Sequence, residues 1–183
     1  MSIGELIDLA VGSKAGHVVL TGGEPMLFPN IEPLAHSLHE AGMHITIETA
    51  GTISRQLPCD LLSLSPKLSN STPAPNDPRD PKSALRVMHE SRRINLPALQ
   101  SLLDSYPTRQ LKFVVKTDSD IAEIKDLLSR LTGWISNDIL LMPEGVTLPN
   151  QTFKSWLVSQ CLENSWRYCP RLHIDLFGHT RGT

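Results

Sequence analysis

Residues 18–25 read Val-Val-Leu-Thr-Gly-Gly-Glu-Pro, and the rest of the chain is organised around this run. Val18, Val19 and Leu20 predict a buried strand, which two glycines, Glu24 and a proline end in a sharp turn. Adjacent glycines lack a β-carbon, so backbone amides and carbonyls can approach a ligand closely. A carboxylate at the carboxyl end of a strand, where α/β sheets bind ligands, suits a small cationic group such as an amine. The alternative is a plain tight turn into the next helix.

The other segments alternate between helical and strand patterns. The helical spacings predict helices over residues 3–13, 31–41, 95–105, 118–131 (with Asp118 as its cap) and 150–164. The apolar runs predict strands over residues 17–20, 44–52, 60–67, 110–116, 138–145 and 171–177. Between them, Pro66–Pro81 holds five prolines and predicts a long irregular loop, either a lid or a disordered segment. Alternating strands and helices indicate crossover units, a parallel sheet and a single α/β domain.

Four of the predicted strands end in short polar or glycine-containing segments. These are Thr21–Pro25, Glu48–Thr52, Ser65–Lys67 and Met142–Gly145. Because the carboxyl ends of parallel strands meet at one edge of a sheet, where such folds keep their sites, the four together predict a functional site.

Composition limits the function further. The chain has 183 residues, 40% of them hydrophobic, a formal net charge of -2 and no apolar run that approaches the length of a membrane span. That charge does not favour nucleic acid as a partner, and the apolar runs are too short for a membrane span. The chain also begins without a signal-peptide pattern, so we expect a cytoplasmic protein. The three cysteines, Cys59, Cys161 and Cys169, match neither a disulfide framework nor a compact metal motif.

The four strand-end segments resemble the radical S-adenosylmethionine (SAM) superfamily and, within it, the 7-carboxy-7-deazaguanine synthase family. The Gly-Gly-Glu-Pro turn marks the superfamily, whereas Glu-Thr-Ala-Gly-Thr followed by Ser-Pro-Lys is more specific. The resemblance implies that Thr21 and Glu48 bind the substrate. It assigns SAM to nine residues: Gly22, Gly23, Glu24, Ser65, Lys67, Met142, Pro143, Glu144 and Gly145.

The resemblance also implies a fold, a reaction and cofactors. The fold would be a partial (β/α) barrel. The intact enzyme would be a lyase that cleaves SAM reductively and converts 6-carboxy-5,6,7,8-tetrahydropterin to 7-carboxy-7-deazaguanine for queuosine biosynthesis. It would use a [4Fe–4S] cluster, Mg²⁺ and an electron donor such as a flavodoxin, and would form a homodimer.

One motif of the family is absent from the sequence. Such enzymes carry a Cys-x3-Cys-x2-Cys loop upstream of the Gly-Gly-Glu-Pro strand, and no cysteine precedes Val18. We therefore expect residues 1–183 to be a single N-terminally incomplete domain that lacks the first strand, the cluster loop and a magnesium-ligating threonine. A cloned fragment, a misplaced start codon or real loss would each explain this.

The sequence leaves two alternative functions open, and it contains two further groups of candidate site residues. The chain could have another radical SAM activity, such as that of a glycyl-radical activating enzyme, or be a cluster-free SAM-binding module without enzymatic activity. Near the carboxyl terminus Arg171, His173, His179 and Arg181 could close over an anionic substrate. His36 and His39 lie three residues apart on a predicted helix, where a solvated face competes with a metal site.

Overall fold

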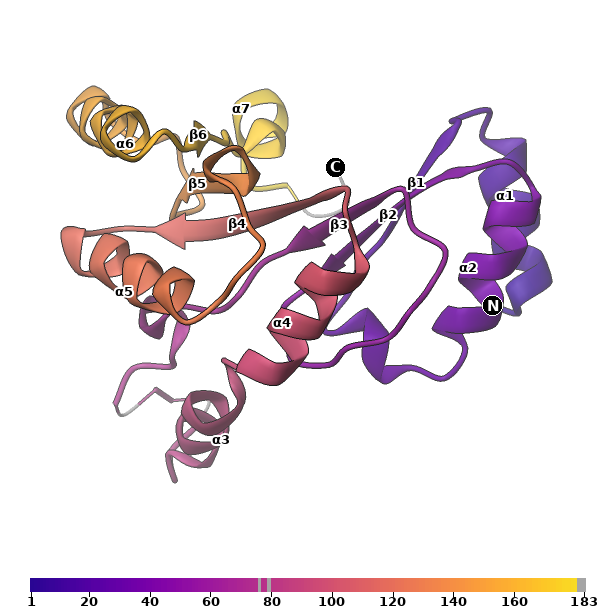
Figure 1. The fold of residues 1–183 in the computed structure, drawn as a ribbon, viewed down its shortest axis with the longest axis horizontal. Helices are drawn as coiled ribbons and strands as arrows, with labels where there is room; N and C mark the ends of the chain where they lie inside the picture. Colours follow the sequence, from indigo (N-terminus) through magenta and orange to yellow (C-terminus); the bar gives the residue numbers. More distant parts are fainter. Residues whose placement is uncertain (76, 79, 181–183) are drawn as a thin grey trace. The chain divides into compact units, whose positions relative to one another are not determined.

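The structure is a computed structural model, and it describes residues 1–75, 77–78 and 80–180. Two compact units make up the chain. Unit 1 comprises Met1–Ser65 and Asn95–Gln110, and unit 2 comprises Pro66–Ile94 and Leu111–Thr183. Each unit combines parallel strands with helices (Figure 1), which confirms the predicted α/β class. The single domain expected from the sequence stays a prediction.

Unit 1 is built on three parallel strands, β1 (His17–Leu20), β2 (His44–Thr49) and β3 (Leu61–Leu64). Leu20 lies opposite Ile47 in β2, and Thr49 lies opposite Leu64 in β3, so the three strands end at one edge. The segments that follow them in sequence are therefore brought together. β1 is less buried than the sequence predicts, since Val19 is 51% exposed. Among the described residues, β1 pairs with β2 alone.

Three helices accompany these strands: α1 (Ile3–Gly12), α2 (Ile31–Glu40) and α4 (Leu96–Ser105). Helix α1 contacts α2, beside which it lies in Figure 1, and α2 contacts β2. The core of the unit consists of fully buried aliphatic side chains from strands and helices, among them Ile45, Ile47, Leu62, Leu64 and Leu102. The predicted boundaries of these elements agree with the structure within a few residues.

Unit 2 carries β4 (Arg109–Val115, whose first two residues belong to unit 1), β5 (Ile139–Pro143) and β6 (Arg167–Tyr168). Strands β4 and β5 are parallel, with Val115 opposite Pro143, and β5 and β6 are also parallel. Its helices are α3 (Ala84–Arg92), α5 (Asp118–Ser129), α6 (Gln151–Asn164) and α7 (Leu172–Phe177). The residues that the structure describes also form three short 3-10 turns, Pro25–Leu27 in unit 1 and Ser69–Ser71 and Ser136–Asp138 in unit 2.

Two secondary-structure predictions in unit 2 are wrong. Residues 171–177 form helix α7, although Leu172, Ile174 and Leu176 alternate with polar residues as in a strand. Only Ile174 of the three is buried, and β6 pairs with β5 at Arg167–Tyr168 instead. The cap of α5 is Thr117 and not Asp118, because the Asp120 carboxylate accepts from the Thr117 N–H at 2.9 Å in a capping box.

Helix α3 was not predicted from the sequence. It carries no buried residue, so it lacks the apolar stripe by which helices are recognised. Among the described residues, no helix is long and apolar enough to cross a membrane.

Candidate functional site

The Gly-Gly-Glu-Pro turn follows β1 in unit 1 and buries its carboxylate. Glu24 is 8% exposed and begins the 3-10 turn over Pro25–Leu27, where its Oε1 accepts from the Met26 N–H at 3.2 Å. Gly22 has φ 149°, a backbone conformation that residues with a β-carbon rarely adopt. Around Gly23, a β-carbon would meet no atom within 4 Å. The turn therefore needs glycine at position 22 for its conformation, and leaves open space beside position 23.

The Glu24 carboxylate ties this turn to the end of β2. The Thr49 hydroxyl donates to it, 2.7 Å from Oε1 and 2.8 Å from Oε2, and the Ala50 N–H donates to Oε2 at 3.0 Å. A longer bond of 3.5 Å comes from the Thr52 hydroxyl. These donors satisfy the hydrogen-bonding capacity of the buried carboxylate. Because they come from the end of β2, Glu24 connects two of the predicted site segments, Thr21–Pro25 and Glu48–Thr52.

The two residues assigned to the substrate lie beside each other. Thr21 Oγ1 donates to Glu48 Oε2 at 3.4 Å, a long hydrogen bond between an exposed hydroxyl and a half-buried carboxylate. Ser65, at the end of β3, joins the same edge, since its N–H donates to the Thr49 carbonyl at 2.7 Å. Unit 1 thus brings together, at one edge of its sheet, Thr21, Gly22, Gly23, Glu24, Glu48 and Ser65.

The remaining predicted SAM residues belong to unit 2. Lys67 is exposed in the loop after β3. Met142 and Pro143 end β5, and the Glu144 N–H extends the ladder by donating to the Val115 carbonyl at 2.9 Å. Gly145 follows with φ 119°, which again favours glycine. Each residue therefore lies at or just beyond a strand end, as the sequence predicts.

Among the polar residues near the carboxyl terminus, Arg171 contacts the segment that follows β5. One Arg171 guanidinium nitrogen donates to the Gly145 carbonyl at 2.5 Å, while Arg171 Nε is buried and has no partner among the described residues. His173 and His179 are exposed, and Arg181 lies outside the described residues. The sequence grouped these residues, but it could not show that Arg171 reaches back to Gly145.

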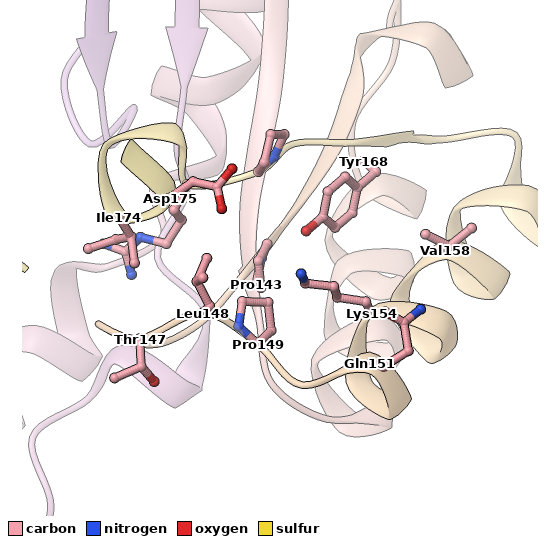
Figure 2. A pocket seen from close by; sticks show the side chains of 12 residues that line it. Pro143, Thr147, Leu148, Pro149, Gln151, Lys154, Val158, Tyr168, Ile174 and Asp175 are labelled. Atoms are coloured by element: carbon pink, nitrogen blue, oxygen red, sulfur yellow. The ribbon is translucent and has the colours of Figure 1, made fainter. Parts of the chain in front are cut away.

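Beside this contact lies a pocket of about 390 Å³ in unit 2. Its wall is formed by the β5–α6 loop, α6, β6 and α7, with the side chains of Pro143, Thr147, Leu148, Pro149, Gln151, Lys154, Val158, Tyr168, Pro170, Arg171, Ile174 and Asp175. Figure 2 shows the Lys154 amine, the Tyr168 hydroxyl and the Asp175 carboxylate turned toward the hollow. Of the residues predicted from the sequence, only Pro143 and Arg171 line it. Lys154 and Tyr168 were not predicted from the sequence, because neither belongs to a recognisable sequence motif.

The described residues do not fit an iron–sulfur cluster. Among them, no group of three or more His, Cys, Asp or Glu side chains could hold a metal ion. Burial raises the pKa of the Cys59 and Cys161 thiols, which keeps them protonated at neutral pH, whereas cluster ligands are thiolates. His36 and His39 are both exposed on α2.

Comparison with known proteins gives the family. No protein-family model matches the chain. A 7-carboxy-7-deazaguanine synthase from Rhodopirellula baltica is 40% identical over 185 residues, which cover 100% of this chain and 69% of the relative. Another, from Halobacterium salinarum, is 42% identical over 186 residues, which cover 97% of this chain and 71% of the relative.

A solved structure supports the same fold. QueE from Escherichia coli matches with a TM-score of 0.63 and 24% identity over 93% of this chain. This chain spans 64% of the length of that one. The likeness confirms the predicted partial barrel, and the two relatives confirm the family predicted from the strand-end motifs. The chain belongs to the 7-carboxy-7-deazaguanine synthase family, radical SAM enzymes of queuosine biosynthesis.

Proposed function

We propose that this chain provides the SAM- and substrate-binding residues for the conversion of 6-carboxy-5,6,7,8-tetrahydropterin to 7-carboxy-7-deazaguanine. One observation carries the proposal. The residues that the family resemblance assigns to substrate, Thr21 and Glu48, are hydrogen-bonded to each other, and the Gly-Gly-Glu-Pro turn is tied to the same strand end. The synthase names of both relatives favour this function over that of a glycyl-radical activating enzyme.

Each part of the edge has its own chemistry. The Glu48 carboxylate accepts hydrogen bonds only, which suits the adjacent N–H groups of a guanine-like ring. The open space beside Gly23 lets the methionine part of SAM lie against the backbone, with the buried charge of Glu24 close by. Ser65 contributes a hydroxyl at the same edge. Lys67, which belongs to unit 2, would contribute a positive charge to SAM by the family resemblance. Met142–Gly145 would contact adenine through backbone groups.

The cofactors and partners of the whole enzyme rest on the resemblance alone. SAM fits the residues described above, whereas no step is assigned to a cluster or to Mg²⁺, because the described residues contain no group of three or more metal-ligating side chains. A homodimer, a flavodoxin-like electron donor and a cytoplasmic location belong to the same proposal.

Titration calorimetry tests the proposal with SAM and with the tetrahydropterin, each added separately to the chain under anaerobic conditions. We expect both to bind. Glu48→Gln should weaken pterin binding by about tenfold or more, since a hydrogen bond to a charged group contributes about 1.5–3 kcal/mol, and should leave SAM binding unchanged within about twofold. Glu32→Gln, an exposed acid on α2, is the matched control. Binding of neither ligand, or equal pterin affinity in both variants, would contradict the proposal.

A further inference from the structure

The loop that carries Lys67 is closed at its base. It leaves β3 at Ser65 and returns to α4 at Leu96, passing through the 3-10 turn Ser69–Ser71 and helix α3. Near its end, Arg93 Nη1 donates to the backbone carbonyl of Lys67 at 3.0 Å. The beginning of this long loop, at Lys67, is therefore hydrogen-bonded directly to its end, at Arg93.

A carboxylate of α5 holds both ends. Glu123 accepts from the Ser69 N–H at 3.1 and 3.0 Å, from the Ser69 hydroxyl at 2.6 Å and from the Arg93 guanidinium at 2.5 Å. The Arg93 side chain is only 17% exposed and that of Glu123 23%, so water screens this pair less than a typical surface ion pair. Charge-assisted hydrogen bonds of this kind are stronger and more directional than neutral ones.

A second acid fixes the orientation of the arginine. Glu90, on α3, accepts from Arg93 Nε at 3.1 Å and also from the Thr72 hydroxyl. The hydrogen bond from Thr72 lowers the Glu90 pKa, which keeps this carboxylate ionised at neutral pH. The planar guanidinium is thus held by Glu90, Glu123 and the Lys67 carbonyl, three acceptors that a single ammonium group would not match in geometry.

We propose that Arg93 and Glu123 are positioning residues for SAM binding, because they fix the backbone from which Lys67 presents its ammonium group. This inference rests on the proposed function, in which Lys67 contacts SAM. A lysine has a long flexible side chain, and the position of its Cα sets the region that the ammonium group can reach. Fixing that backbone reduces the entropy that is lost when the ligand binds, so loosening it weakens binding without removing any contact to the ligand.

Arg93→Ala tests the inference by two readouts. Amide hydrogen exchange at Ser69 reports on the loop base directly, and we expect it to become at least about tenfold faster. Calorimetry with SAM should give an affinity about tenfold weaker, with pterin binding unchanged within about twofold. Arg130→Ala is the matched control, because Arg130 also pairs with an α5 acid, Asp126, at 3.6 Å, but 53% of its side chain is exposed.

Combining the variant with Lys67→Ala separates positioning from general destabilisation. If Arg93 acts through Lys67, the double variant binds SAM no more than about twofold more weakly than Lys67→Ala alone. Additive losses, unchanged exchange at Ser69, or wild-type SAM affinity in Arg93→Ala would each overturn the inference while the proposed function stands. A wild-type chain that does not bind SAM would overturn the proposed function itself, and this inference with it.

Discussion

Replacing Glu24 with glutamine should destabilise the protein markedly, although the two side chains have nearly the same shape. Each carboxylate oxygen accepts one backbone N–H, Oε1 from Met26 at 3.2 Å and Oε2 from Ala50 at 3.0 Å. In glutamine one of these oxygens becomes an NH₂ group, which donates and does not accept. Whichever way the amide lies, one backbone N–H then faces a donor. The Thr49 hydroxyl can turn toward the remaining oxygen, so its bond survives.

The cost follows from these contacts. Leaving a buried N–H without an acceptor costs about 1–3 kcal/mol, and the surviving hydrogen bonds lose roughly 1 kcal/mol because the acceptor is no longer charged. We therefore expect Glu24→Gln to lower the free energy of unfolding by about 2–4 kcal/mol, a large share of the 5–15 kcal/mol typical of whole proteins. For a protein of this size, that corresponds to a melting temperature lower by about 4–16 °C.

Urea unfolding followed by circular dichroism measures this effect, with the exposed Glu32→Gln expected to stay within about 0.5 kcal/mol of the wild type. Thr49→Val then tests the contact itself. It removes the hydroxyl that lies 2.7 and 2.8 Å from the two carboxylate oxygens. Because this bond survives in Glu24→Gln but loses its charged acceptor, the effects of the two substitutions should be coupled by roughly 1 kcal/mol. Unchanged stability of Glu24→Gln, or strictly additive effects, would refute the reasoning.

Three further predictions concern other residues. Gly22→Ala should lose about 1–3 kcal/mol of stability in the same assay, because φ is 149° there, whereas Gly23→Ala should keep its stability but weaken SAM binding by calorimetry. Tyr106→Phe should cost about 1–3 kcal/mol in urea unfolding, since the buried Tyr106 hydroxyl accepts from the Leu57 N–H at 2.7 Å; an unchanged midpoint would contradict this. Burial raises the Cys59 pKa, so iodoacetamide at pH 7.5 should modify this thiol more slowly than glutathione, and the rate should still rise above pH 9 as the thiolate forms; rapid modification at pH 7.5 would contradict it.

The strand-end motifs could be predicted from the sequence because each follows a short apolar run. The boundaries of β1, His17–Leu20, match the prediction, as the β-branched run stops at a glycine pair. Helix α3 could not be predicted in this way, because its apolar residues stay exposed and polar contacts such as that between Arg93 and Glu90 hold its end. Residues 172–177 alternate in polarity, yet the sheet pairs with Arg167–Tyr168, a choice that depends on tertiary contacts.

The hydrogen bonds of the Glu24 carboxylate also could not be predicted from the sequence. A carboxylate has about four lone-pair directions. Here the Met26 N–H, the Ala50 N–H and the Thr49 hydroxyl take three of them within 3.2 Å, and the Thr52 hydroxyl approaches only to 3.5 Å. Most of the acceptor capacity therefore maintains the turn. An amine near this edge would find one weakly used direction and the negative charge. If SAM binds as proposed, we therefore expect Glu24 to contribute mainly by holding the glycine backbone in place and by electrostatic attraction.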